Sequence, residues 1–412
     1  IVNDLQRPQA MNRLLQGDVG AGKTIVALLA ALVAMENGLQ VAFMAPTELL
    51  SEQHYVTISK VLRGSRFMVA QLTGGRGAAS QAQRAAIARG DVHLIVGTHA
   101  LVERGVAFHR LGLVVIDEQH RFGVLQRATL RTKGARPDVL VMTATPIPRT
   151  LALTMYGDLD VSVIRERPPG RLPVKTAAKP ESRRDEVYAF VKEEIAAGRQ
   201  AYVVFPLVEE SDKLDLRAAT EMSDHLAHDV FPACRVGLLH GRLKSEARER
   251  VMQAFGAGDL DLLVATSVVE VGIDVPNATV MVVEHAERFG LSQLHQLRGR
   301  VGRGRHQSYC CLLYQAPLSD EARGRLKAMT DTSDGFVIAE RDLAIRGPGD
   351  FFGTRQAGAP TFRLIDLVRD HHVVAQAQED AAAWLETTRP GRIALERILD
   401  RWASRFQLID VA

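Results

Sequence analysis

Short apolar segments alternate with longer, helix-prone segments along the first 156 residues of the chain. Each apolar segment is four or five residues long, and alanine-rich or amphipathic segments separate them. This alternation is typical of a mainly parallel sheet that helices cover on both faces. We expect strands at residues 13–16, 41–45, 93–97, 113–116 and 139–142.

A second series of the same kind follows a segment rich in proline, glycine and charge. Residues 158–171 contain Pro168, Pro169 and Gly170, which is typical of a connector. The second series predicts strands at residues 201–208, 236–240, 261–266, 280–284 and 308–314. Helical patterns then dominate, at 318–329 and 334–346, and Pro348 is predicted to end the second helix. We therefore expect domains at 1–158 and 175–316, a linker at 159–174 and a helical extension at 317–412.

Composition and charge agree with a multidomain globular protein. A chain of 412 residues exceeds what one hydrophobic core usually serves, and 46% hydrophobic with 24% charged residues is ordinary for this class. The net charge of +3 permits nucleic acid as a partner without demanding it. No apolar run is long enough for a membrane span, and no signal peptide is evident, so we expect no membrane partner and a cytoplasmic location. The chain begins at Ile1 without a methionine, which suggests a fragment.

Three cysteines, Cys234, Cys310 and Cys311, show neither a C-x-x-C pair nor metal-ligand spacing. We expect them to be reduced core residues.

The segment from Gly17 to Thr24 carries the clearest chemical signal. It fits G-x-x-x-x-G-K-[ST], a loop whose backbone N–H groups and following helix hold the phosphates of a nucleotide. Lys23 would neutralise phosphate charge, and the Thr24 hydroxyl would ligate Mg²⁺. A plain glycine turn between strand and helix is the alternative. The expected cofactor-binding residues are Gly17, Asp18, Val19, Gly20, Ala21, Gly22, Lys23 and Thr24.

Two adjacent acids, Asp117 and Glu118, follow the apolar strand 113–116. Acids at the end of a buried strand are well placed to serve a bound cation, although a solvated strand end gives the same pattern. We expect Asp117 to hold Mg²⁺ and Glu118 to orient or deprotonate the attacking water.

Arginines and glycines alternate between residues 296 and 305. Arginine stays charged and binds phosphate oxygens in pairs, so Arg300 and Arg303 are candidates for stabilising a transferring phosphoryl group. Gln296, which begins the segment, joins them as a catalytic candidate. For Arg298 and Arg305 a solvated loop or a contact with a phosphate backbone is at least as good an interpretation.

Taken together, these motifs resemble those of superfamily 2 helicases that remodel branched DNA. The resemblance covers nearly the whole chain. It rests on MNRLLQGDVG at 11–20, DEQHRFGV at 117–124, TATPIPRT at 143–150, RGPG at 346–349 and GTRQAG at 353–358. It implies two tandem RecA-like domains with mainly parallel sheets and a helical C-terminal extension.

The resemblance also implies an activity: an ATP- and Mg²⁺-dependent motor that acts on stalled forks and Holliday junctions in recombination and repair. Its partners would be branched or duplex DNA and a single-stranded DNA-binding protein, in a bacterial nucleoid. Thr47, Thr98 and Thr266, at strand ends, would contact the DNA backbone, and Arg355 would lie in a loop that moves along duplex DNA. An upstream wedge domain of the family is missing from this sequence.

Two alternatives stay open. Transcription-repair coupling translocases, which move along duplex DNA, share the C-terminal hairpin with these helicases, although residues 156–160 and 353–356 favour the branched-DNA group. A P-loop ATPase could also act as a switch that closes on nucleotide without separating strands.

Overall fold

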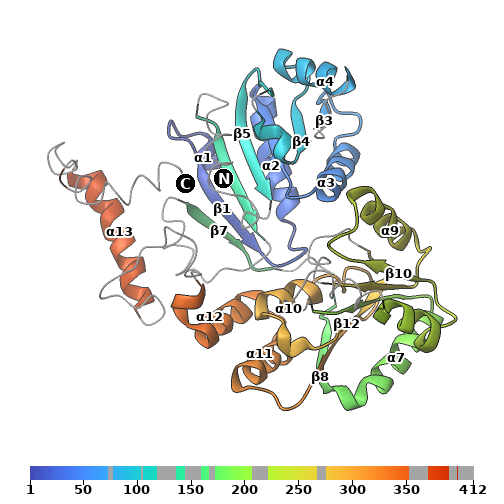
Figure 1. The fold of residues 1–412 in the computed structure, drawn as a ribbon. Coiled ribbons are helices and arrows are strands. Elements are labelled where there is room, and N and C mark those ends of the chain that lie inside the picture. The colour runs from blue at the N-terminus through green and yellow to red at the C-terminus, as the bar shows by residue number, and fades with distance from the viewer. Residues whose placement is uncertain are drawn as a thin grey trace. The chain divides into compact units, whose positions relative to one another are not determined.

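The computed structural model describes residues 1–72, 78–103, 105–117, 136–143, 159–166, 172–206, 221–266, 275–351, 370–388 and 397. Contacts divide the chain into two compact units (Figure 1). The first comprises Ile1–Gly17, Gly22–Ile164 and Arg346–Ala412, and the second comprises Asp18–Ala21 and Arg165–Ile345. Residues 18–21 of the phosphate loop thus group with the second unit.

The first unit is built on a seven-stranded sheet in which every pair of neighbouring strands is parallel. The strand order is β3-β4-β2-β5-β6-β1-β7. The strands are β1 Asn12–Gly17, β2 Gln40–Met44, β3 Val69–Leu72, β4 Leu94–Gly97, β5 Leu111–Asp117, β6 Asp138–Thr143 and β7 Asp160–Ile164.

Neighbouring residues of one strand enter opposite cores of the first unit. Leu15 of β1 packs in a core with alanines of α2 and with Ile58 of α3, whereas Leu14 packs in a core with Ile87 of α4. Both faces of the sheet are therefore buried, which explains why its inner strands are continuous apolar runs. The helical elements are α1 Val2–Leu5, α2 Lys23–Glu36, α3 Glu48–Val61, α4 Ala78–Arg89 and the 3-10 turn η1 His99–Val102.

The second unit repeats this plan with a six-stranded parallel sheet in the order β10-β11-β9-β12-β13-β8. Val187, Tyr188 and Val191 of α7 pack on one face of it. The strands are β8 Lys175–Pro180, β9 Gln200–Val204, β10 Val236–Leu239, β11 Leu262–Ala265, β12 Ala278–Val283 and β13 Tyr309–Tyr314. The helical elements are η3 Glu181–Arg183, α7 Arg184–Ala196, η4 Leu226–Val230, α9 Ser245–Ala257, η6 Ala286–Arg288 and α10 Leu291–Arg298.

The C-terminal part contains the predicted helices, α11 Asp320–Asp331 and α12 Gly335–Phe351, followed by α13 His371–Thr388. Ser319 caps α11, because its hydroxyl accepts a hydrogen bond from the N–H of Ala322 at 3.1 Å. The prediction that Pro348 ends α12 is wrong: a proline removes one helical hydrogen bond, and this helix continues to Phe351. Within the described residues no helix combines the length and hydrophobicity that a membrane span requires.

Three strands differ from the sequence prediction, and all three lie at sheet edges. β3, β7 and β8 were not expected, and β7 lies within residues 159–174, the expected linker. Edge strands have one neighbour, and these three are largely half-buried or exposed, so their sequences lack the apolar run that marks an inner strand. Cys310 and Cys311 are buried free thiols in β13, as predicted, and burial raises the pKa of Cys310 to about 12.

Candidate nucleotide-binding site

The phosphate loop joins β1 to α2 through backbone that only glycine adopts readily. Gly20 has φ 74° and Gly22, the residue before the first turn of α2, has φ 90°. An L side chain at either position would be strained, which explains the glycines. Thr24 lies in the first turn of α2, whose free N–H groups and dipole favour an anion.

Lys23 directly follows the glycines of this loop and is the first residue of α2. Its side chain is buried, and Nζ donates a hydrogen bond to the carbonyl oxygen of Gly17 at 2.8 Å. A buried ammonium needs such a partner, and phosphate oxygens are the stronger acceptors for it. The arrangement is suited to an incoming phosphate.

Asp117 is the last residue of β5. It lies at the carboxyl end of the parallel strands, as the phosphate loop after β1 does. Across β6, Asp117 and Leu15 share the partner Met142, so the acid lies level with Leu15, two residues before the end of β1 at Gly17. Its Oδ2 accepts a hydrogen bond from Nε2 of His54 in α3 at 2.8 Å. The His54 ring also packs on Phe43, with ring centroids 4.7 Å apart. Glu118 lies outside the described residues.

The contact between His54 and Asp117 has no counterpart in the sequence prediction. The two residues are 63 positions apart, and an isolated histidine in a helix carries no signal of its own. Their meeting follows from the fold, because α3 begins where β2 ends and β2 pairs with β5.

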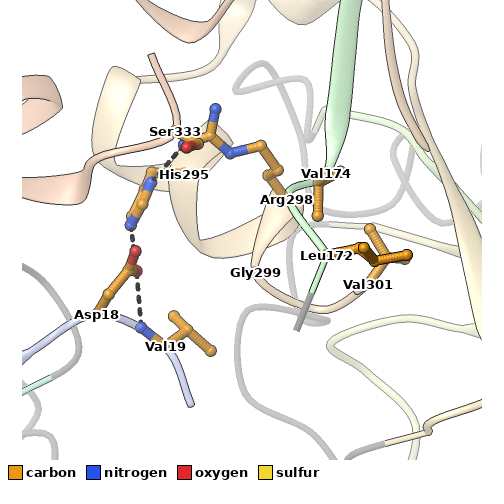
Figure 2. Close-up of a pocket in the computed structure, with 9 residues that line it drawn as sticks. All are labelled: Asp18, Val19, Leu172, Val174, His295, Arg298, Gly299, Val301 and Ser333. Atoms are coloured by element: carbon orange, nitrogen blue, oxygen red, sulfur yellow. Dashed lines mark hydrogen bonds and ion pairs between the residues drawn. The ribbon is translucent and has the colours of Figure 1, made fainter. Parts of the chain in front are cut away.

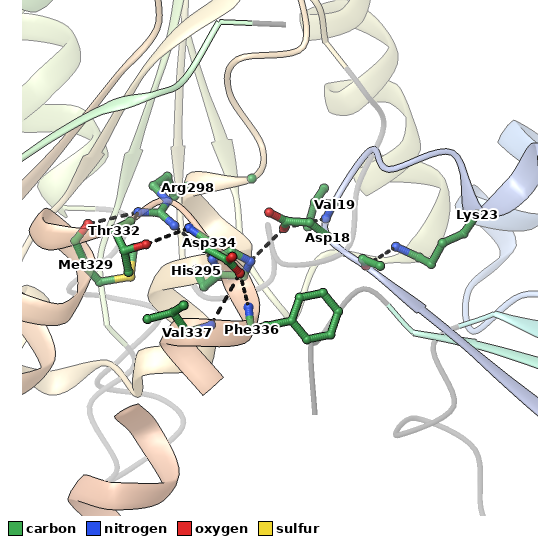
Figure 3. Close-up of polar contacts among 12 residues, drawn as sticks. Asp18, Val19, Lys23, His295, Arg298, Met329, Thr332, Asp334, Phe336 and Val337 are labelled. Atoms are coloured by element: carbon green, nitrogen blue, oxygen red, sulfur yellow. Dashed lines mark hydrogen bonds and ion pairs between the residues drawn. The ribbon is translucent and has the colours of Figure 1, made fainter. Parts of the chain in front are cut away.

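A chain of polar contacts in the second unit starts at the tip of the loop (Figure 3). Oδ1 of Asp18 accepts hydrogen bonds from the N–H of Val19 at 2.7 Å and from Nε2 of His295 at 2.9 Å. Nδ1 of His295 lies 3.1 Å from Nη2 of Arg298. Nη1 of that arginine donates to the carbonyl oxygens of Met329, at 3.0 Å, and Thr332, at 2.8 Å.

Arg298 is therefore neither a solvated residue nor a contact for a phosphate backbone, which corrects both sequence interpretations. Its side chain is 4% exposed and donates hydrogen bonds to two backbone carbonyl oxygens at the C-terminal end of α11. His295 is equally buried and was not predicted as a site residue.

Arg300 and Arg303, which follow α10, lie near the hydroxyl of Tyr202 in β9. Burial raises the pKa of Tyr202 to about 12, and the positive charges of both arginines act in the opposite direction. Nε of Arg303 donates to the carbonyl oxygen of Gly299 at 3.0 Å. Gln296 lies on α10, one turn before Arg300. The three candidates therefore lie within one short segment, and its two arginines both act on Tyr202 of β9.

A small pocket of about 40 Å³ lies beside the loop tip (Figure 2). Polar Asp18, His295 and Arg298 line it together with apolar Leu172, Val174 and Val301. A volume of this size suits a water molecule, and a nucleotide is far larger.

The three threonines predicted to contact DNA have different surroundings. Thr47 caps α3, and its hydroxyl accepts a hydrogen bond from the N–H of Leu50 at 3.3 Å. Thr98 precedes η1 and is half-buried. Thr266 is 3% exposed, so its hydroxyl does not face solvent in this structure. The predicted contact of Thr266 with the DNA backbone stays a prediction. Arg355 lies outside the described residues.

Comparison with known families matches three successive parts of the chain. Residues 2–154 match the family described as DEAD/DEAH box helicase, and residues 184–305 match the helicase conserved C-terminal domain. Residues 332–404 match the family described as ATP-dependent DNA helicase RecG, domain 3, C-terminal.

Whole-chain comparisons agree with these families. The chain is 54% identical over 382 residues to the ATP-dependent DNA helicase RecG of Synechocystis, covering 92% of this chain and 46% of that protein. It is 50% identical to the Bacillus subtilis protein of the same name, covering 93% and 56%. Among solved structures, RecG bound to a three-way DNA junction matches with a TM-score of 0.75 and 46% identity, over 90% of this chain and 48% of the other. The chain spans about half the length of these relatives.

Proposed function

Because the chain belongs to the family of the ATP-dependent DNA helicase RecG, we propose that it is the ATP-driven motor of a helicase that remodels branched DNA. The chain contains two tandem RecA-like helicase domains, each with a parallel sheet. The observation that carries the proposal is the glycine loop with Lys23 at its mouth, since this geometry suits the phosphates of a nucleotide.

The proposed domain boundaries follow the sheets. We place the ATP-binding domain at residues 1–164, because β7 pairs with β1, and the connector at 165–174. The second domain then covers 175–316 and the helical extension 317–412.

Residues of the loop would bind the phosphates through Gly20, Gly22 and Lys23. Thr24 and Asp117 would hold Mg²⁺, which, when bound, supplies positive charge to the phosphates. In the described part of the chain, no three His, Cys, Asp or Glu side chains cluster as a metal site. The expected donors, one hydroxyl and one carboxylate, fit Mg²⁺, because this ion takes one or two protein carboxylates and fills its shell with water and phosphate oxygens.

Glu118 would take the proton of the attacking water, and Arg300 and Arg303, with Gln296, would stabilise charge on the transferred phosphoryl group. We propose that hydrolysis requires both RecA-like domains, because the loop and the arginines belong to different domains of the chain. Such a requirement would tie hydrolysis to movement.

DNA contacts would come from Thr47, Thr98 and Thr266, and from Arg355. Hydroxyl groups hold the phosphate backbone without reading bases, so we expect binding without sequence preference and with steep salt dependence. The similarity to RecG bound to a three-way junction supports branched DNA as the substrate. We further propose a single-stranded DNA-binding protein as a partner in the nucleoid.

The test measures ATP turnover by residues 1–412 alone, with blunt duplex, and with forked DNA. Turnover is a better readout than unwinding, because the chain spans about half the length of its relatives. We expect the largest stimulation by forked DNA. Equal stimulation by duplex would favour a duplex translocase, and turnover unchanged by any DNA would leave an ATPase switch instead.

A further inference from the structure

The contact between Arg298 and His295 determines which ring nitrogen of the histidine carries a hydrogen. A guanidinium group can only donate, so Nδ1 of His295, which lies 3.1 Å from Nη2 of Arg298, must accept. The ring hydrogen therefore lies on Nε2, where it points to the carboxylate of Asp18 at 2.9 Å. This assignment follows from the partners of the ring.

Arg298 is itself fixed at the C-terminal end of α11. Carbonyl oxygens in the last turn of a helix lack partners within the helix, and Arg298 donates to two of them, at Met329 and Thr332. A cation is also favoured near this end of a helix dipole. The guanidinium, buried and bound on two sides, therefore holds the histidine ring in one orientation.

A second observation ties the loop tip to the end of α10. A Cβ atom added at Gly299 would lie 2.9 Å from Cγ2 and 3.0 Å from Cβ of Val19, so the glycine permits a close approach of the loop. Val19 also donates its N–H to Asp18. Asp18 and Val19 of the phosphate loop therefore both contact the segment 295–299, which contains His295.

We infer that His295 is a positioning residue of the phosphate loop: its Nε2–H holds the Asp18 carboxylate, and Arg298 fixes the tautomer that makes this contact. The inference rests on the proposed function, because it assumes that this loop binds nucleotide phosphates. A held carboxylate keeps the Val19 N–H and the following loop residues in one conformation, so less ordering remains for nucleotide binding. The effect should appear in nucleotide affinity and KM more than in kcat.

Two substitutions separate the two hydrogen bonds of the His295 ring, the one to Asp18 and the one from Arg298. His295→Gln places an amide nitrogen near the position of Nε2 and can still donate to Asp18. His295→Asn places an oxygen near the position of Nδ1, so it can still accept from Arg298, but it is too short to reach Asp18. We expect His295→Asn to raise the Kd for ADP and the KM for ATP by about tenfold, the loss of one hydrogen bond to a charged group. His295→Gln should stay within about twofold of the wild type.

The readouts are the Kd for ADP by titration calorimetry, KM and kcat for ATP, and the thermal unfolding midpoint. A structural role alone would lower the unfolding midpoint of both variants with Kd unchanged, and that result would overturn the inference. Equal weakening by Asn and Gln would overturn it too. Asp18→Ala tests the contact from its other end, should a His295 variant fail to fold, and must show the same rise in Kd.

A double-mutant cycle completes the test. If the contact carries the effect, Asp18→Ala and His295→Asn together should raise Kd no more than either alone, whereas independent effects would multiply. The wild type is assayed for turnover in parallel. Absence of wild-type turnover would contradict the proposed function, while the ADP titrations would still decide the role of His295.

Discussion

The imidazole of His54 donates a hydrogen bond of 2.8 Å to the carboxylate of Asp117, the residue that we propose as a magnesium ligand. The His54 ring also packs against the ring of Phe43, with centroids 4.7 Å apart. A hydrogen-bonded partner of this kind fixes the orientation of a ligand, and its removal typically costs ten- to a hundredfold in metal affinity, as an order of magnitude.

We therefore predict that His54→Ala raises the Mg²⁺ concentration for half-maximal Mg-dependent binding of ADP by about tenfold. Calorimetric titration of ADP at a series of Mg²⁺ concentrations measures it. His54→Gln, which keeps a donor near Nε2, should recover most of the affinity. His99→Ala removes an exposed imidazole of the same unit and serves as the control. An unchanged Mg²⁺ dependence in His54→Ala would separate this histidine from the metal.

Lys23→Ala should abolish ATP turnover while the chain remains folded. The ammonium already lies at the mouth of the loop, 2.8 Å from the Gly17 carbonyl, and its loss leaves phosphate charge without its nearest cation. Steady-state turnover and circular dichroism give the two readouts. Lys60→Ala, which removes an exposed lysine at the end of α3, should behave as the wild type. Normal turnover by Lys23→Ala would refute the assignment of the loop.

The phosphate loop and the inner strands could be predicted because their signals are local. A glycine pattern of eight residues or an apolar run of five is complete within one segment, and the strands containing Leu14 and Val114 were found on this basis. β3, β7 and β8 were missed because edge strands bury less and need no such run.

The contacts that hold the site could not be predicted, because they join residues far apart in sequence. Asp18 and His295 are 277 positions apart, and no local sequence pattern at either position predicts the contact with the other. Burial is equally non-local: Arg298 occurs in a polar, glycine-rich segment of the sequence, yet its side chain is 4% exposed.

Arg303→Ala should slow hydrolysis while nucleotide binding is largely retained. An arginine that meets the transferred phosphoryl group acts mainly in the transition state, and such residues are worth roughly a thousandfold or more in kcat. Single-turnover hydrolysis and the Kd for ADP separate the two effects. Arg305→Ala, in the same segment but exposed, is the matched control. Hydrolysis at the wild-type rate would remove Arg303 from the site.

The stability of the second unit depends on a buried carboxylate at the end of β12. Glu284 is fully buried, accepts a hydrogen bond from the Tyr188 hydroxyl at 2.6 Å and pairs with Arg184 at 3.0 Å. Burial, together with the charge of Glu284, raises the pKa of Tyr188, so its hydroxyl remains a donor. A buried charge that loses its partner costs several kcal/mol, and less where the partner is partly exposed, as Arg184 is.

We therefore predict that Arg184→Ala lowers the local stability of β12 and α7 by about 2 kcal/mol, because Glu284 would keep its burial and lose its cation. Amide hydrogen exchange in the full chain measures this change segment by segment, without assuming that both units unfold together. Arg183→Ala is the neighbouring control: that arginine pairs with Glu186 at the surface, where an ion pair is screened by water, so exchange should not change. If Arg184→Ala and Arg183→Ala gave the same exchange rates, the buried carboxylate would have to be stabilised without its arginine, and the Tyr188 hydroxyl would be the group to remove next.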